Sequence, residues 1–172
     1  MRIIAGTHRG HTISAPPGTD TRPTSDRVRE NVFNILGPVD GASVLDLYAG
    51  SGAMGLEALS RGAERAVFVE RDHDAAHVIE RNLDKLRLRG TVLRRDAVSV
   101  LASETRKYDL VLVDPPYHMY LDVQAQLARY LPGVLSEDGV VVVETDARIE
   151  PELPLPQRTS RKYGAARITV YG

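Results

Sequence analysis

The sequence contains no cysteine, which excludes disulfide bonds and metal sites built on thiolates. It has no apolar run long enough to cross a membrane, and residues 1–10 lack the apolar segment of a signal peptide. Internal repeats and low-complexity tracts are missing as well. From these absences we expect a soluble domain with a cytoplasmic location and no membrane partner.

The chain has almost no excess charge, with 22 basic and 23 acidic residues among 172. Composition alone therefore does not indicate a polyanionic partner, and any nucleic-acid surface has to be a local patch. The length suffices for one domain with a substantial core but not for two ordinary domains. Functional signals must therefore come from local motifs.

The first strong motif runs from Ser43 to Gly55. An apolar stretch that carries one acid, Asp46, predicts a buried strand, and Gly50 and Gly52 predict a tight turn after it. Residues 53–61 then have the apolar spacing of a helix. Strand, glycine turn and helix bring backbone N–H groups and a helix N-terminus against a ligand, and glycine allows close approach. The motif predicts a nucleotide-type cofactor site.

Two interpretations of this site compete. Gly50, Gly52 and Gly55, with Glu70 following on the next strand, match the dinucleotide fingerprint of NAD(P)-binding oxidoreductases. Asp46 opposes that interpretation, because a carboxylate inside the strand would repel a pyrophosphate that approaches the turn. A buried carboxylate needs a partner, and the ammonium of a zwitterionic ligand would supply one.

A second motif decides between them. Asp114, Pro115, Pro116 and Tyr117 directly follow an apolar run, 110–113. Together the two motifs resemble those of S-adenosylmethionine-dependent methyltransferases that act on exocyclic amines. The expected cofactor is therefore S-adenosyl-L-methionine, and no metal is expected.

The Asp-Pro-Pro-Tyr turn has the chemistry for positioning an amine. A nucleobase amine is a weak nucleophile, so a site needs to hold its nitrogen and draw on its hydrogens rather than supply a strong base. Asp114 and the Pro115 carbonyl can each accept one N–H, while two prolines fix φ and remove competing donors. Tyr117 can stack on the base. His118 lines the same pocket or is a plain surface residue.

Strands and helices alternate from residue 44 onward, which predicts a parallel sheet with helices on both faces. Expected strands cover 44–48, 66–70, 91–94, 109–113, 139–144, 158–163 and 166–171, and expected helices cover 53–61, 72–88, 97–104 and 123–131. The last two strands form a hairpin after a proline-rich segment, 149–157. This pattern resembles the Rossmann-like methyltransferase fold, an α/β sheet of seven strands in the order 3-2-1-4-5-7-6 with strand 7 antiparallel.

Ligands of such a sheet bind beyond the carboxyl ends of the strands, where the strand order reverses. Here that point lies between the first and fourth strands, so the Gly50 turn and Asp114 should face each other. Glu70 ends the second strand and can accept hydrogen bonds from both ribose hydroxyls. Asp96 can accept from an adenine amino group beside the Ala97 N–H, or it caps the next helix, and the two roles are compatible.

The most basic segment precedes the cofactor strand. Residues 2–5 and 11–14 predict two short strands of a hairpin, and Arg2, His8, Arg9 and His11 gather around it. These side chains indicate phosphate contact by the hairpin and its neighbouring loop. The alternative is a solvated surface.

A helix should follow the hairpin and end at 37–38. It begins near Ser25 or Asp26, with Thr24 or Ser25 as its N-cap. If the basic residues of this arm do not contact phosphates, its helical charges form intrahelical pairs such as Asp26 with Arg29.

Segments 2–11, 22–34, 45–63 and 69–72, together with 114–117, are similar to the RsmD-type family. Its members methylate the N2 amine of the guanine at position 966 of 16S ribosomal RNA in the small ribosomal subunit. An acid rather than asparagine at the head of the second motif also fits a guanine amine better than an adenine amine. The resemblance implies residues 1–40 as an extension for RNA contact and residues 41–172 as the S-adenosylmethionine-binding methyltransferase domain.

By this resemblance, Arg22, Pro23, Thr24 and residues 26–29 border the cofactor and RNA sites. The expected RNA contacts are Arg2, His8, Arg9, His11, Arg22 and Arg29. The expected cofactor site comprises Thr24, Arg27, Asp46, Tyr48, Ala49, Gly50, Ser51, Gly52, Glu70, Arg71, Asp96, Ala97 and Asp114. We expect a monomer that acts on an assembling or assembled small subunit. Methylation of a DNA base or a protein glutamine, and a catalytically silent RNA-binding module, are the alternatives.

Overall fold

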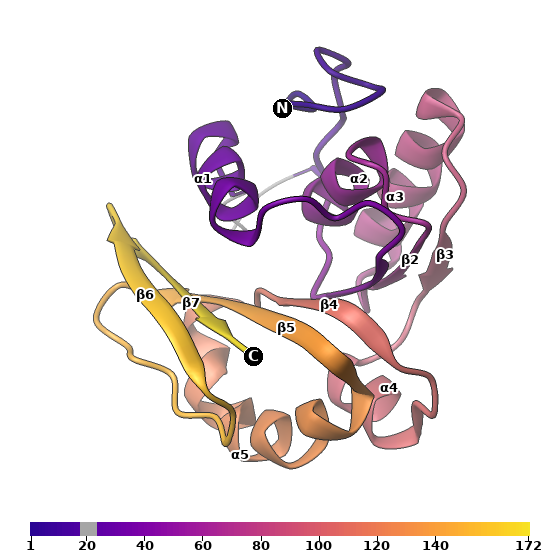
Figure 1. The fold of residues 1–172 in the computed structure, drawn as a ribbon. Helices are drawn as coiled ribbons and strands as arrows, with labels where there is room; N and C mark the ends of the chain where they lie inside the picture. Colours follow the sequence, from indigo (N-terminus) through magenta and orange to yellow (C-terminus); the bar gives the residue numbers. More distant parts are fainter. Residues whose placement is uncertain (18–23) are drawn as a thin grey trace.

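The computed structural model describes residues 1–17 and 24–172. Its seven-stranded sheet has the order β3-β2-β1-β4-β5-β7-β6, in which β7 runs antiparallel to both neighbours and the other pairs are parallel (Figure 1). The strands are β1 (Ser43–Leu47), β2 (Arg65–Val69), β3 (Thr91–Leu93), β4 (Tyr108–Val113), β5 (Leu135–Asp146), β6 (Gln157–Tyr163) and β7 (Ala166–Tyr171). The predicted fold class and strand order are confirmed.

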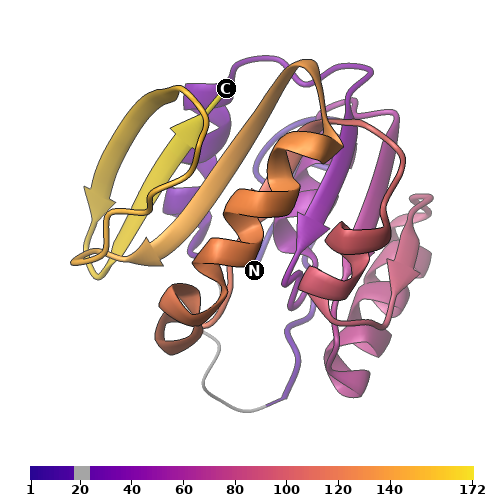
Figure 2. The ribbon, with the colours of Figure 1, turned by 90° about the horizontal axis from the view of Figure 1, so that it is seen from below.

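Helices cover both faces of the sheet (Figure 2). In the view of Figure 1, α1 (Asp26–Leu36), α2 (Ala53–Ser60) and α3 (His73–Leu86) lie above the sheet, and α4 (Ala97–Ser103) and α5 (Tyr120–Tyr130) lie below it. Successive side chains of β1 alternate between the two layers, as a strand requires. Val44 belongs to the cluster with α1, α2 and α3, whereas Leu45 and Leu47 belong to the cluster with α4 and α5. No helix in the described ranges is long and apolar enough to cross a membrane.

Helix caps settle two choices that the sequence left open. The Ser25 side chain accepts a hydrogen bond from the Val28 amide at 3.2 Å, so Ser25 rather than Thr24 is the N-cap of α1. Asp72 caps α3 and Asp96 caps α4 in the same way. The capping role of Asp96 is therefore present, and the adenine contact stays a prediction.

The predicted N-terminal hairpin is present as a turn but not as two strands. A single antiparallel bridge joins Arg2 to Thr12. The amides of Ile4 and Ala5 instead donate to the Glu57 side chain of α2, at 2.8 and 3.1 Å. Ile3 still pairs across the turn, since its amide donates to the His11 carbonyl and its carbonyl accepts from the Gly10 amide, both at 2.9 Å. The hairpin is therefore short, and the amides of Ile4 and Ala5 join it to α2.

The chain after β4 departs slightly from the predicted bounds. The helix α5 begins at Tyr120 after a short 3₁₀ turn, η1 (Tyr117–Met119), and Pro132 lies in a second 3₁₀ turn, η2 (Leu131–Val134). The β5 strand begins earlier than expected, where Leu135 pairs with Tyr108 of β4, and it ends later, where Thr145 and Asp146 pair with β7. The C-terminal hairpin is confirmed.

Candidate active site

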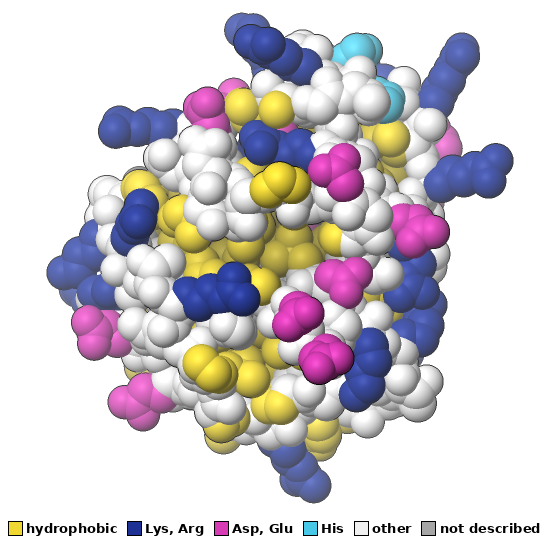
Figure 3. Space-filling model, viewed as in Figure 1, with side chains coloured by type: hydrophobic (Ala, Val, Ile, Leu, Met, Phe, Trp, Pro, Cys, Tyr) yellow, Lys and Arg dark blue, Asp and Glu magenta, His cyan; other side chains and the backbone are white. Residues whose placement is uncertain are grey.

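A cavity of about 930 Å³ opens at the carboxyl ends of β1, β2, β4 and β5. Figure 3 shows a hollow floored by hydrophobic side chains, with acidic side chains along one side and Lys and Arg around it. Both sequence motifs reach it: the predicted site residues that line it are Thr24, Asp46, Tyr48, Ala49, Gly50, Ser51, Glu70, Arg71, Asp96, Ala97, Asp114, Pro115, Pro116 and Tyr117. The structure therefore brings the glycine turn and the Asp-Pro-Pro-Tyr turn to one cavity, because β1 and β4 are neighbours.

The glycine turn is held by a carboxylate from the neighbouring strand. Gly50 has φ 59°, and its amide donates to Glu70 Oε1 at 2.8 Å. Glu70 Oε2 accepts from the Asp72 amide, also at 2.8 Å. Each oxygen keeps capacity to accept a further hydrogen bond, and Glu70 lines the cavity. Glu70 thus shapes the turn, and its predicted contact with ribose hydroxyls is compatible with that role.

Asp46 is a buried carboxyl at the floor of the site, 3% exposed. The Gly55 amide at the start of α2 donates to its Oδ2 at 3.0 Å. Burial raises the pKa of Asp46 to about 8. The hydrogen bond from Gly55 opposes this rise, and the charge of Glu70 adds to it. A cation that enters the cavity beside Asp46 would favour the ionised form.

Close packing explains the third glycine of the motif. A Cβ on Gly55 would lie 2.4 Å from Cε1 of Phe68 and 3.0 Å from Asp46 Oδ2. Gly52 lies behind the turn against Ile79 and, unlike the other predicted residues of the turn, is absent from the cavity lining as described. Its φ of 81° permits the turn, so its contribution is conformational.

The wall beside β3 combines an acid with a tyrosine. Asp96 Oδ2 accepts from the Ser99 amide at 3.0 Å and from its hydroxyl at 3.2 Å. Tyr48 adopts φ 57°, which is unusual for a non-glycine residue. Burial and the charge of Asp96 raise the pKa of Tyr48 to about 12, so the phenol stays neutral at physiological pH.

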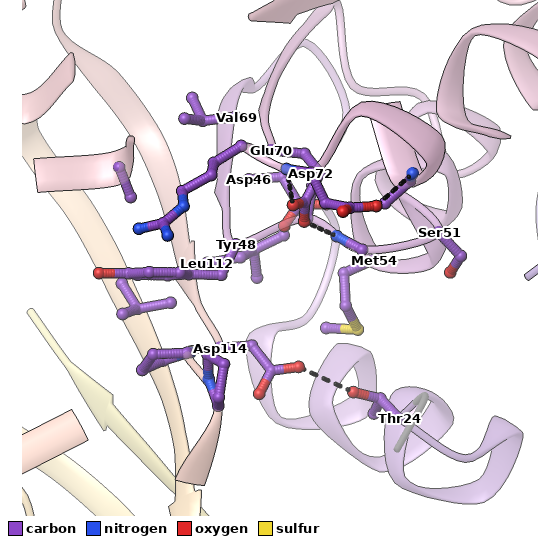
Figure 4. Close-up of a pocket in the computed structure, with 18 of the residues that line it drawn as sticks. Thr24, Asp46, Tyr48, Ser51, Met54, Val69, Glu70, Asp72, Leu112 and Asp114 are labelled. Atoms are coloured by element: carbon purple, nitrogen blue, oxygen red, sulfur yellow. Dashed lines mark hydrogen bonds between the residues drawn. The ribbon is translucent and has the colours of Figure 1, made fainter. Parts of the chain in front are cut away.

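Asp114 lies on the opposite side of the cavity from the acids of the glycine turn (Figure 4). The Thr24 hydroxyl donates to its Oδ2 at 3.5 Å, and Met54 lies between Asp114 and the Asp46–Glu70 side in this view. Burial, the charge of Glu144 and a hydrogen bond with Glu144 hold the pKa of Asp114 well above its usual range.

The sequence did not indicate several cavity residues. Glu144, near the end of β5, is the most important of them and is 8% exposed. The only signal for it in the sequence is that it ends the apolar strand predicted over 139–144. Met54, His73 and residues 15–17 also line the cavity. Arg27 is exposed and lies outside the cavity lining of the described chain. Arg22 and Pro23 lie outside the described residues.

Three of the predicted RNA-contact residues are exposed, namely Arg2, Arg9 and His11. His8 is half-buried, and its ring nitrogens are engaged by the Leu86 carbonyl at 2.7 Å and the Thr7 hydroxyl at 2.7 Å. His8 therefore joins the turn to α3. Because both of its ring nitrogens are engaged, they are not available to contact RNA.

The RNA contact predicted for Arg29 is wrong. Its side chain is fully buried, with 0% exposed, and pairs with Glu57 at 3.3 Å and Asp26 at 2.8 Å. It also donates to the carbonyls of Thr24 and Arg2. All three guanidinium nitrogens thus donate within the protein, and these bonds join α1, α2 and the N-terminal segment.

Comparisons with known proteins agree with this architecture. A family model described as "Conserved hypothetical protein 95" matches residues 1–172. Ribosomal RNA small subunit methyltransferase D of Escherichia coli is 38% identical over 156 residues, which are 90% of this chain and 78% of that protein. The protein of the same name from Haemophilus influenzae is 35% identical over 85% of this chain and 79% of its own length.

Solved structures show the same similarity. The Escherichia coli protein yhhF superposes with a TM-score of 0.86 at 34% identity, covering 99% of this chain and 96% of that one. The Thermus thermophilus protein TTHA0928 gives 0.86 at 29% identity, covering 99% and 98%. The resemblance drawn from the motifs is confirmed, and the chain belongs to the RsmD-type family of methyltransferases.

Proposed function

We propose that this protein transfers a methyl group from S-adenosyl-L-methionine to the exocyclic N2 amine of a guanine in 16S ribosomal RNA of the small subunit. The observation that carries the proposal is the meeting of the glycine turn and the Asp-Pro-Pro-Tyr turn in one cavity. The names of the relatives supply the substrate class, since they are small-subunit ribosomal RNA methyltransferases. The choice of guanine N2 rests on the family resemblance and on the acid at position 114.

The described residues fit this cofactor. The cavity, about 930 Å³, has the size of sites that enclose cofactors. Asp46 would hold the ammonium group, Glu70 the ribose and Asp96 the adenine amine, while the neutral Tyr48 borders the same wall. S-adenosylmethionine would supply an electrophilic methyl group on a sulfonium. An antiparallel β7 and a buried Asp46 argue against the alternative of NAD(P).

Asp114 and its neighbours would position the acceptor. The carboxyl of Asp114 and the carbonyl of Pro115 accept the amine hydrogens and point the nitrogen at the incoming methyl group. Tyr117 provides a stacking surface for a base that has been turned out of its helix. The proton lost by the amine passes to an Asp114 oxygen.

The RNA would approach over the N-terminal extension, residues 1–40. Exposed Arg2, Arg9 and His11 lie on that segment and can contact phosphates. One basic segment on a near-neutral chain gives limited nonspecific RNA affinity, which favours an assembling or assembled small subunit as the substrate. We propose that the protein acts there as a cytoplasmic monomer.

Labelled methyl transfer tests the proposal. The protein is incubated with S-adenosylmethionine carrying a radioactive methyl group and, separately, with unmethylated small subunits, free 16S RNA, DNA and ribosomal proteins. We expect label in the RNA of small subunits, with the methylated nucleotide identified by mass mapping of ribosomal RNA from cells that lack the protein. Label in protein or DNA without label in RNA would refute the guanine assignment, and tighter binding of NADH than of S-adenosylhomocysteine would refute the cofactor.

Cofactor affinity should depend on pH because of Asp46. Its carboxyl is protonated below a pKa of about 8 in the free protein and must ionise to pair with the ammonium. Binding therefore releases a proton, and affinity for S-adenosylhomocysteine should rise roughly fifty-fold between about pH 6 and about pH 8, then level off. Isothermal titration in buffers of different ionisation enthalpy measures both effects. The Asp46→Asn variant should lose most of this slope, and an unchanged slope would exclude Asp46 as its source.

A further inference from the structure

Two acids from neighbouring strands meet at the end of the cavity that would receive the base. Val113 and Val143 are paired in the parallel register of β4 and β5, so Asp114 and Glu144 follow at the same level of the sheet. Both side chains line the cavity, and burial, the charge of Glu144 and a hydrogen bond with Glu144 raise the pKa of Asp114. Within the described ranges neither carboxyl takes part in an ion pair with a cationic side chain.

A hydrogen bond between two carboxyls requires a proton between them. Burial and the charge of Glu144 raise the pKa of Asp114, which favours a single proton held by the Asp114 carboxyl and shared with Glu144. The shared proton occupies one oxygen of each residue. The remaining oxygen of each residue is an acceptor, which gives the pair two adjacent acceptors and no outward donor.

This pattern matches one base edge. Guanine presents two neighbouring donors, N1–H and N2–H, whereas adenine and cytosine place a ring nitrogen acceptor beside the amine. Building on the proposed function, we propose that Glu144 is a specificity-determining residue. In this arrangement Asp114 accepts a hydrogen bond from guanine N2–H, and Glu144 accepts one from guanine N1–H. In adenine and cytosine the ring nitrogen beside the amine would face an acceptor oxygen of Glu144, and the two lone pairs would repel each other. The site would therefore disfavour these bases.

Replacement of the target guanine by 2-aminopurine isolates this contact. That base keeps the N2 amine but has no hydrogen on N1. Small-subunit RNA is ligated from segments with guanine or 2-aminopurine at the mapped position, and single-turnover methylation is compared. The wild-type protein should prefer guanine by about 10- to 100-fold. In Glu144→Gln the side-chain amide can donate to the bare N1, so the preference should shrink at least ten-fold.

Three controls separate this role from a structural one. Glu137→Gln changes an exposed acid of the same strand and should keep the wild-type preference. Glu144→Asp keeps an acceptor carboxylate on a shorter side chain, so it should retain the preference for guanine while the rate of guanine methylation falls. This variant replaces Glu144→Gln in the comparison if Glu144→Gln does not fold. S-adenosylhomocysteine affinity should be unchanged in Glu144→Gln.

The outcomes are distinct. An unchanged preference in a folded Glu144→Gln protein overturns the role of Glu144 while leaving the proposed function standing. A wild-type protein that methylates both bases equally also overturns it. A wild-type protein that methylates no guanine in small-subunit RNA refutes the proposed function, and this inference with it.

Discussion

Replacement of Asp114 by alanine should lower the rate of methyl transfer by about 10²–10³ while the affinity for S-adenosylhomocysteine changes less than about three-fold. The carboxyl lies at the far side of the cavity from Asp46 and Glu70, next to Thr24, so its loss affects the acceptor rather than the cofactor (Figure 4). Single-turnover transfer to small subunits gives the rate, and isothermal titration gives the affinity.

Asparagine at position 114 should have a milder effect than alanine. A carboxamide can donate to Glu144 and still present one carbonyl oxygen to the amine. The expected order of rates is therefore wild type, Asp114→Asn, Asp114→Ala. Asp138→Asn, an exposed acid at the beginning of β5, is the matched control and should leave the rate unchanged. Retained turnover in Asp114→Ala would show that Asp114 does not position the amine, and equal losses in rate and affinity would place it in the cofactor site.

The sequence predicted the sheet well because its signals are local. Alternation of apolar strands with amphipathic helices determines a parallel sheet, and the tail hairpin determines the antiparallel end. The glycine turn and the Asp-Pro-Pro-Tyr turn then had to share one edge, because β1 and β4 are adjacent on either side of the reversal in strand order. Both motifs line the same cavity in the structure.

What the sequence did not reveal depends on contacts between distant residues. Glu144 ends the apolar strand predicted over 139–144, and nothing local shows that β5 brings it beside Asp114. The resemblance placed Arg29 among the RNA contacts, whereas its side chain is buried. Its main partner, Glu57, lies 28 residues further along the chain on α2. The N-terminal hairpin also depends on Glu57, which accepts from the amides of Ile4 and Ala5, and no local pattern shows that contact with α2.

The buried cluster around Glu57 should therefore be the largest single contributor to stability among the charged residues of the described chain. Glu57 is 0% exposed and accepts from Arg29 at 3.3 Å, Arg61 at 2.8 Å and the amides of Ile4 and Ala5. Alanine at position 57 removes all four acceptor contacts and leaves the Arg29 guanidinium buried without this partner. We expect a loss of about 3–5 kcal/mol in the free energy of unfolding, which lowers the melting temperature by roughly 6–20 °C.

Arg29→Met should cost less than Glu57→Ala, because Glu57 would keep Arg61 and the two backbone amides. Glu64→Ala, at an exposed acid between α2 and β2, is the control and should change stability by less than about 0.5 kcal/mol. Urea unfolding followed by circular dichroism measures all three. Since Glu57 also holds the first five residues, limited proteolysis should cleave the N-terminal segment faster in Glu57→Ala than in Arg29→Met. If Glu57→Ala were no less stable than Glu64→Ala, the N-terminal segment would have to be held by contacts other than this cluster.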